Sequence, residues 1–318
     1  MAKIAFGPVP SRRLGKSIGI NNIPPKVCSY ACIYCQLGRA IKMEFQRKAF
    51  YKPEEVVEKV TQQVRKAEDS EESLDYLTFV PDGEATLDVH LGEEISALKR
   101  LGYKLAIITN SSLMNSEDVQ NELMKLDLVS IKVDTAEEEI WRKINHPHKQ
   151  LYFNDIKHGL RQYSRKYKGK LITETMLIDG VNDSRETLEK TAAFLAELNP
   201  DTAYISIPTR PPARKSVNPA KEKTINLAYQ IFFGYVNHVE MIIGHEGNAF
   251  AHTGDTEQDI LSITAVHPMR EDSIREFLDK AGKSWDIIEQ LMRDEKLLET
   301  EYRGNKYYVR KFSNRQQI

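Results

Sequence analysis

Residues 28–38 read Cys-Ser-Tyr-Ala-Cys-Ile-Tyr-Cys-Gln-Leu-Gly, and this stretch contains the only three cysteines of the 318-residue chain. The spacing C-x3-C-x2-C allows the thiolates of Cys28, Cys32 and Cys35 to converge from one loop, and thiolates are ligands that suit iron and zinc. A structural zinc site takes four protein ligands, whereas this stretch offers three. The stretch therefore predicts a metal centre with one open position; the simpler alternatives are a zinc knuckle or three reduced core cysteines.

Around this loop, short apolar runs alternate with helix-like segments. Repeated βα units favour a parallel sheet or barrel, in which the loops after the strands share one mouth. The opening segment, residues 7–15, is rich in turn formers, and residues 141–150 are predicted to be irregular. Six strands are predicted at residues 17–20, 74–80, 104–109, 128–133, 170–177 and 203–207, and helices at residues 53–68, 89–101, 116–125, 154–167, 184–198 and 220–233.

Polar residues follow several of these strands. A glycine and a carboxylate at the end of the second strand, Gly83 and Glu84, let backbone and acid approach a ligand's ammonium group. Arginines near the mouth suit an anionic substrate group, although paired surface arginines are often solvated. Further binding candidates are Asn110, Ser111, Lys132, Asp134 and Asn182, each with a capping or loop role as the alternative, and the substrate candidates are Arg12, Arg13, Arg210 and His245.

Beyond residues 264–268 the sequence changes from strand–helix alternation to two helices and a hairpin. Helices are predicted at residues 270–280 and 284–293, followed by a hairpin at 297–302 and 306–311, which is the outline of a winged-helix module. The segment 302–318 has five basic residues and no acid, interleaved with Tyr302, Tyr307, Tyr308 and Phe312. This pattern suits a surface that binds phosphates and stacks bases, although such modules also dock on proteins or on their own chain.

The amino-acid composition limits which kinds of partner the protein can attract by its overall charge. The chain has 45 basic and 46 acidic residues and a net charge of −1, so no global field attracts it to nucleic acid or membrane. No signal-peptide pattern and no run of 18 apolar residues occurs, so we expect a cytoplasmic protein without membrane insertion.

The motif C-x3-C-x-aromatic-C, with Tyr34 before Cys35, resembles the signature of radical S-adenosylmethionine (SAM) enzymes. The resemblance implies that the three cysteines hold a 4Fe-4S cluster whose fourth iron binds SAM, and that a flavodoxin or ferredoxin-like donor supplies the electron that cleaves SAM to a 5'-deoxyadenosyl radical. Gly83 and Glu84 resemble the end of the G-G-E motif, with Asp82 in place of its first glycine. By the same resemblance the SAM-binding residues are Tyr34, Gly83, Glu84, Asn110, Ser111, Lys132, Asp134 and Asn182.

The resemblance also implies an α/β fold: a partial (β/α)6 radical SAM barrel with N-terminal extension over residues 1–256, and a linker with a small C-terminal winged-helix-like domain over residues 257–318. The chain is similar to the 4-demethylwyosine synthases, which act on tRNA with a second cluster and a Schiff-base lysine. No cysteine precedes Cys28, and the upstream lysines Lys3, Lys16 and Lys26 stand in no distinguishing context. These departures disfavour the wyosine reaction itself. With the C-terminal module as a handle, we expect an oxidoreductase or transferase that acts on a tRNA or other nucleic-acid base. The alternatives are a small molecule or protein side chain as substrate, or an iron-sulfur redox-sensing winged-helix regulator.

Overall fold

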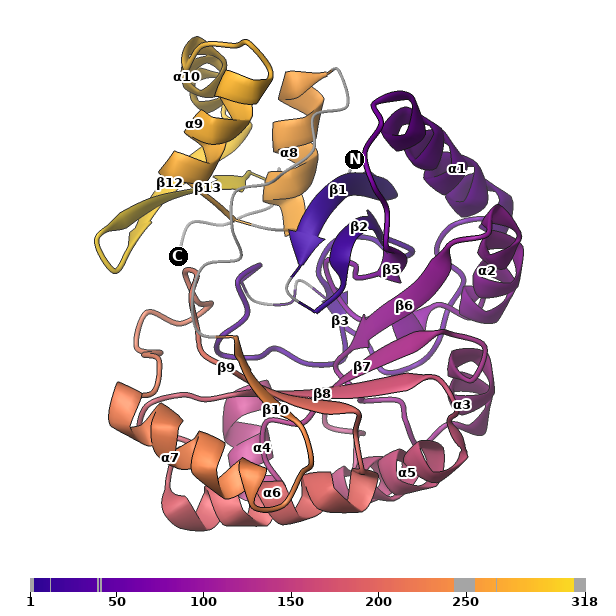
Figure 1. The fold of residues 1–318 in the computed structure, drawn as a ribbon, viewed down its shortest axis with the longest axis vertical. Coiled ribbons are helices and arrows are strands. Elements are labelled where there is room, and N and C mark those ends of the chain that lie inside the picture. Colours follow the sequence, from indigo (N-terminus) through magenta and orange to yellow (C-terminus); the bar gives the residue numbers. More distant parts are fainter. Residues whose placement is uncertain are drawn as a thin grey trace.

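The computed structural model describes residues 3–11, 13–38, 40, 42–242, 255–266 and 268–311. Among these residues, eight strands form one curved sheet in the order β1-β2-β5-β6-β7-β8-β9-β10 (Figure 1). The strands from β2 to β10 are parallel to one another, and β1 is antiparallel to β2. Their bounds are β1 (Ala5–Ser11), β2 (Gly15–Ile20), β5 (Tyr76–Phe79), β6 (Lys104–Thr109), β7 (Leu128–Lys132), β8 (Lys170–Met176), β9 (Thr202–Ser206) and β10 (Val239–Ile242).

Each crossover between successive parallel strands contains a helix, and these helices cover the outer side of the curved sheet (Figure 1). The first crossover helix shows why: Val56, Val60 and Val64 recur every four residues and are buried, so one stripe of the helix faces the sheet. The crossover helices are α1 (Pro53–Asp69), α2 (Leu91–Leu98), α3 (Glu117–Leu123), α4 (Glu138–Asn145), α5 (Phe153–Lys166), α6 (Arg185–Leu198) and α7 (Glu222–Phe233), with short 3-10 turns at η1 (Ala85–Leu87) and η2 (Lys99–Leu101).

The predicted α/β fold with six parallel βα strands is confirmed. Within the described residues the edge strands β1 and β10 do not pair with each other, so the sheet is an open, partial barrel. Because the strands from β2 to β10 are parallel, their carboxyl ends lie at one side of the sheet, where the loops that follow them meet.

Three elements differ from the prediction. The turn-rich opening segment is strand β1, which accommodates Pro8 and Pro10 because an edge strand pairs on one side only. Residues Val239–Ile242, where no strand is predicted, form a further strand, β10, parallel to β9. Helix α4 occupies the first half of the stretch predicted to be irregular, where Trp141 and Ile144 are buried one turn apart.

The C-terminal part has its own apolar core, to which Phe277, Ile288 and Tyr308 belong. The predicted helices and hairpin are present there, and Val9 of β1 packs against this core. The winged-helix assignment and the boundary between residues 256 and 257 stay predictions. The elements are α8 (Thr256–Val266), β11 (Met269–Arg270), α9 (Glu271–Lys280), α10 (Asp286–Arg293), β12 (Leu297–Tyr302) and β13 (Asn305–Arg310), with β13 in the middle of the small sheet.

No helix within the described ranges combines the length and the apolar character that crossing a bilayer requires.

Candidate functional site

The cysteine loop follows β2 and is anchored by the end of α4. The Ala31 N–H donates to the Asn145 carbonyl at 2.9 Å, and the Ile33 N–H donates to the Ile144 carbonyl at 2.9 Å. A side-chain contact adds to these: the indole N–H of Trp141 in α4 donates to the hydroxyl of Tyr30 in the cysteine loop at 3.1 Å. Helix α4 therefore fixes the backbone that carries the three cysteines, a role that its sequence did not suggest.

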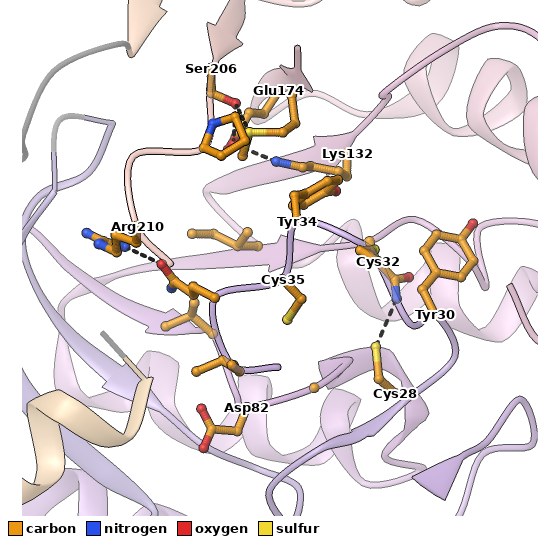
Figure 2. A pocket seen from close by; sticks show the side chains of 18 of the residues that line it. Cys28, Tyr30, Cys32, Tyr34, Cys35, Asp82, Lys132, Glu174, Ser206 and Arg210 are labelled. Carbon is orange, nitrogen blue, oxygen red and sulfur yellow. Dashed lines mark hydrogen bonds and ion pairs between the residues drawn. The ribbon is translucent and has the colours of Figure 1, made fainter. Parts of the chain in front are cut away.

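The cysteines line a cavity of about 320 Å³ at the carboxyl ends of the strands. Figure 2 shows Cys28, Cys32 and Cys35 around one side of this space, with Lys132, Glu174 and Ser206 across from them. A cavity of this size, bounded by a few polar groups, is typical of a small-molecule site. The predicted residues that line it are Cys28, Cys32, Cys35, Tyr34, Gly83, Asn110, Lys132, Arg13 and Arg210.

The environment of the sulfurs fits an iron-sulfur cluster. All three thiols are free, and burial raises their pKa values, that of Cys32 to about 12. Such thiols stay protonated unless a metal binds the thiolate. Side-chain amides of Asn110 and Asn145 lie 3.5 and 3.4 Å from the sulfurs of Cys28 and Cys32, and amide donors to sulfur tune clusters of this kind.

The described side chains form no ready-made cage for a single metal ion. No group of three or more His, Cys, Asp or Glu side chains among them is arranged to surround one ion. In a cubane cluster each cysteine binds a different iron, so the sulfurs need to border one space without converging on one point. Cys28, Cys32 and Cys35 all line one cavity, as the three protein ligands of one cluster would.

Gly83 stands where the loop after β5 crosses the cysteine loop. A Cβ atom at this position would lie 1.9 Å from the Val27 carbonyl oxygen, so only glycine permits the close approach. The neighbouring Glu84 N–H donates to the same carbonyl at 3.2 Å. Gly83 thus brings the backbone of this loop to the wall of the cavity.

The buried side chain of Glu84 does not line the cavity and lies in the protein interior behind the residues that do. Its Oε1 accepts hydrogen bonds from the Thr86 and Thr109 hydroxyls at 2.7 and 2.6 Å, and its Oε2 accepts from the Asn110 N–H at 2.7 Å. Burial raises the pKa of this carboxyl, and the hydrogen bonds from Thr109 and Thr86 partly offset the rise. Glu84 therefore orients the ends of β5 and β6, including the cavity residue Asn110.

Asp134 and Asn182 form a second buried network behind the wall. The Tyr34 hydroxyl and the Asn145 amide donate to Asp134 Oδ2 at 2.6 and 2.8 Å, and the Met176 N–H donates to Oδ1 at 3.0 Å. Asn182 in turn donates to the Asp134 carbonyl at 2.8 Å. These two predicted cofactor residues support Tyr34 and the cysteine loop and do not border the main cavity.

Ser111 is likewise buried behind the wall, at a left-handed φ of 68°. Its hydroxyl accepts a hydrogen bond from the Lys132 N–H at 3.0 Å. Ser111 therefore fixes the end of β7, from which Lys132 reaches the cavity.

The charged wall opposite the cysteines centres on Glu174, which the sequence analysis missed. Lys132 Nζ donates to Glu174 Oε1 at 2.5 Å, the Ser206 hydroxyl donates to the same oxygen at 2.9 Å, and Arg13 pairs with Oε2. Burial lowers the pKa of Lys132 to about 8, although the Asp134 carboxylate raises it. The only indication in the sequence was a glutamate inside an apolar strand. That this glutamate pairs with Lys132 depends on the register between β7 and β8, which places the two residues side by side.

The other arginine candidate lies at the edge of the cavity. Arg210 follows β9, and its guanidinium donates to Gln36 Oε1 at 2.6 Å (Figure 2). Of the lysines upstream of the cysteines, Lys26 lines the cavity and Lys16 pairs with Glu72. The candidates Arg12 and His245 lie outside the described residues.

The prediction of a base-stacking surface on the C-terminal hairpin is wrong for two of its tyrosines. Tyr307 and Tyr308 are 4% and 2% exposed, so their rings cannot stack on bases. The Tyr302 and Tyr307 hydroxyls donate to the Pro208 and Thr209 carbonyls at 3.1 and 2.9 Å. The hairpin therefore docks on the barrel loop that leads to Arg210, and Phe312 lies outside the described residues.

Comparisons with known proteins agree with this site. Residues 22–195 match the Radical SAM superfamily model. The chain is 46% identical to the UPF0026 protein MJ1312 of Methanocaldococcus jannaschii, with 98% of this chain and 97% of that protein covered. A UPF0026 protein of Helicobacter pylori is 35% identical over 72% of this chain and 73% of its own length.

Solved structures show the same fold at low sequence identity. A radical SAM methyltransferase from Sphaerobacter thermophilus aligns with a TM-score of 0.54 and 16% identity over 72% of this chain and 67% of that chain. TYW1 with a lysine-pyruvate adduct aligns with a TM-score of 0.55 and 17% identity over 69% of this chain and 74% of that chain. The chain therefore belongs to the radical SAM superfamily, whose members use a 4Fe-4S cluster and SAM.

Proposed function

We propose that this radical SAM enzyme abstracts a hydrogen atom from a small anionic substrate held in the cavity beside Cys28, Cys32 and Cys35. A cluster held by the three cysteines would supply the one electron that cleaves SAM, and the 5'-deoxyadenosyl radical released beside methionine would take the hydrogen. The observation that carries the proposal is the charged wall: two cations, Arg13 and Lys132, share the single carboxylate of Glu174 on the same cavity. Their excess positive charge suits a carboxylate or phosphate.

Within this proposal the chain's own residues have separate roles. Gly83 lets the loop backbone approach the amino group of SAM, and Asn110 and Lys132 offer donors from the adjoining strand ends. Arg13 and Arg210 border the cavity where the anionic group of a substrate would lie. Glu84, Ser111, Asp134 and Asn182 act as positioning residues, because their polar atoms hold the cavity residues in place.

A small substrate is favoured over a nucleic-acid base because the tyrosines expected to stack bases are buried. The cavity of about 320 Å³ adjoins both the cysteines and the charged wall, so radical and substrate can meet in it. A tRNA substrate is the alternative outcome of the deuterium-transfer experiment described below.

Anaerobic reconstitution tests the proposal. We expect reduced protein to form 5'-deoxyadenosine from SAM, and deuterium from a labelled small acid to appear in that product. The panel contains carboxylates, 2-oxo acids and phosphates, with tRNA as a separate arm. Arg13→Gln is expected to impair deuterium transfer while SAM cleavage without substrate continues; deuterium transfer from tRNA alone would replace the small-acid assignment.

A further inference from the structure

The sequence segments around the cysteine loop are free of acidic residues. The first 43 residues contain seven Lys or Arg and no Asp or Glu, residues 140–154 contain three Lys or Arg and no acid, and residues 202–221 contain four and no acid. The whole chain has a net charge of −1. Basic charge is therefore concentrated in three segments that are far apart in the sequence.

The fold brings these three segments together on the outer side of the cysteine loop. The Ala31 N–H donates to Asn145 O, and the Arg214 N–H donates to Ile33 O at 3.1 Å. Between the segments lies a second hollow of about 200 Å³, lined by Ala31, Cys32, Ile33, His146, Ala213 and Arg214. Cys32 borders both this hollow and the main cavity, so it connects the outer surface with the cluster site.

Exposed cations line this hollow or lie close in sequence to the residues that line it. Arg214 lines it, and Lys215 follows directly in the chain; Lys143 lies in the last turn of α4, just before His146, and Lys149 follows shortly after it. We call these four exposed residues the basic rim. No salt bridge among the described residues involves any of the four, whereas the neighbouring Arg142 pairs with Glu138.

We infer that the basic rim is the docking surface for an acidic one-electron carrier protein, which reduces the cluster from the Cys32 side. The inference rests on the proposed radical SAM reaction, which consumes one electron from outside the chain. Unneutralised surface charge of one sign accelerates association with a partner of the opposite sign. An apolar centre with a charged border is also the anatomy of a protein–protein interface, and redox complexes use small interfaces of this kind.

A nucleic acid is the less favoured occupant of this surface. The hollow is lined mainly by apolar atoms of Ala31, Ile33 and Ala213, and none of its lining residues has an aromatic ring besides the imidazole of His146. Binding of single-stranded nucleic acid typically combines basic grooves with aromatic stacking platforms. The position beside Cys32 instead fits electron entry.

The test uses the full chain with its cluster reconstituted anaerobically. The variant Lys143→Glu/Arg214→Glu is compared with the control Lys59→Glu/Arg65→Glu, which reverses two exposed charges on α1 away from the cysteine loop. Cluster reduction is followed by its own absorbance, without SAM, using either an acidic reduced flavodoxin or the small reductant reduced methyl viologen. Electrostatic steering changes association rates by roughly 10- to 1000-fold, so we expect the rim variant to slow reduction by flavodoxin at least tenfold.

The same variant should keep the wild-type rate with methyl viologen, and the control should keep both rates. Added salt should slow flavodoxin in the wild type and in the control, but much less in the rim variant. Lys149→Glu/Lys215→Glu repeats the experiment if the first variant folds poorly. An unchanged rate with flavodoxin, or an equal loss with both reductants, overturns the inference.

A further experiment distinguishes an electron-carrier protein from a nucleic acid as the partner that binds the basic rim. If tRNA binds the wild type, fails to bind the rim variant, and flavodoxin reduces both equally, the surface belongs to nucleic acid and the inference is wrong. Absence of SAM cleavage with methyl viologen would instead refute the proposed function, because cluster reduction is measured without SAM.

Discussion

Tyr34 in the cysteine loop and Tyr307 in the C-terminal hairpin both donate a hydrogen bond from the phenol, Tyr34 to the Asp134 carboxylate and Tyr307 to the Thr209 carbonyl. Tyr34 still borders the main cavity, where its ring faces the Lys132 ammonium at 5.2 Å. Tyr307 is 4% exposed and lies between the hairpin and the barrel.

The two regions thus differ in what remains available to a ligand. The hairpin looks like a nucleic-acid surface in the sequence, but its aromatic rings are used to pack the C-terminal elements and to dock them on the loop after β9. The segments beside the cysteine loop contain basic residues and no acids, and the structure leaves Arg214 exposed at the hollow that Cys32 also lines. An interleaved pattern of aromatic and basic residues therefore does not identify a binding surface until burial is known.

The largest difference in SAM cleavage is expected between a substitution in the cysteine loop and a substitution in the hairpin. Cys32→Ala removes one of the three proposed cluster ligands, so we expect cluster binding and 5'-deoxyadenosine formation to be abolished. The matched hairpin change is Tyr308→Phe, whose hydroxyl bonds Glu299 within the hairpin; it should keep wild-type SAM cleavage. Iron content and product formation check both, and a Cys32→Ala protein that still cleaves SAM would refute the assigned ligand set.

A smaller effect is expected at the crossing of the two loops. In Gly83→Ala the new Cβ meets the Val27 carbonyl, and relieving such an overlap costs on the order of 1–3 kcal/mol. We expect SAM binding, measured by calorimetry on the cluster-loaded protein, to weaken by about tenfold or more, since 1.4 kcal/mol corresponds to about tenfold. Gly234→Ala is the control, because Gly234 has a helical φ of −74° and its nearest contact would be 3.3 Å; equal SAM affinity of Gly83→Ala and wild type would show that the loop moves freely.

The amide donors to sulfur should give a change in redox behaviour without loss of the cluster. Asn145→Ala removes the donor 3.4 Å from the Cys32 sulfur. A donor stabilises the more negative reduced cluster, so its loss should lower the reduction potential. Potentiometric titration followed by electron paramagnetic resonance measures the shift, and Asn218→Ala, an exposed amide that bonds the Ser216 carbonyl, should leave the potential unchanged. A potential that rises in Asn145→Ala would contradict the assignment.

The smallest effect is expected in the hairpin. Tyr307→Phe removes the hydrogen bond to the Thr209 carbonyl, which should lower the free energy of unfolding by about 1 kcal/mol. Denaturant unfolding measures this change, and Tyr152→Phe, whose side chain is 64% exposed, should leave stability unaltered. Unchanged stability in Tyr307→Phe would contradict the conclusion that this hydrogen bond helps to hold the hairpin on the barrel loop.

Much of the barrel could be predicted because local sequence patterns specify its strands and helices. The apolar runs gave the six strands, and the spacing of Val56, Val60 and Val64 gave the first crossover helix. Strand β1 was missed because its prolines disfavour a strand unless the strand lies at an edge, and edge position is a property of the whole sheet. Helix α4 was missed because it is short and its buried residues contact the cysteine loop, which lies far away in the sequence.

The sequence by itself determined that three candidate metal ligands, Cys28, Cys32 and Cys35, share one short loop. It also determined the alternation of strands and helices and the near-zero net charge. Tertiary structure decided which polar residues face the cavity, because Glu84, Ser111, Asp134 and Asn182 turn behind the wall while Glu174 joins Arg13 and Lys132. The physical reason is that hydrogen bonds and ion pairs between distant segments depend on strand register and burial, which residue order alone does not specify.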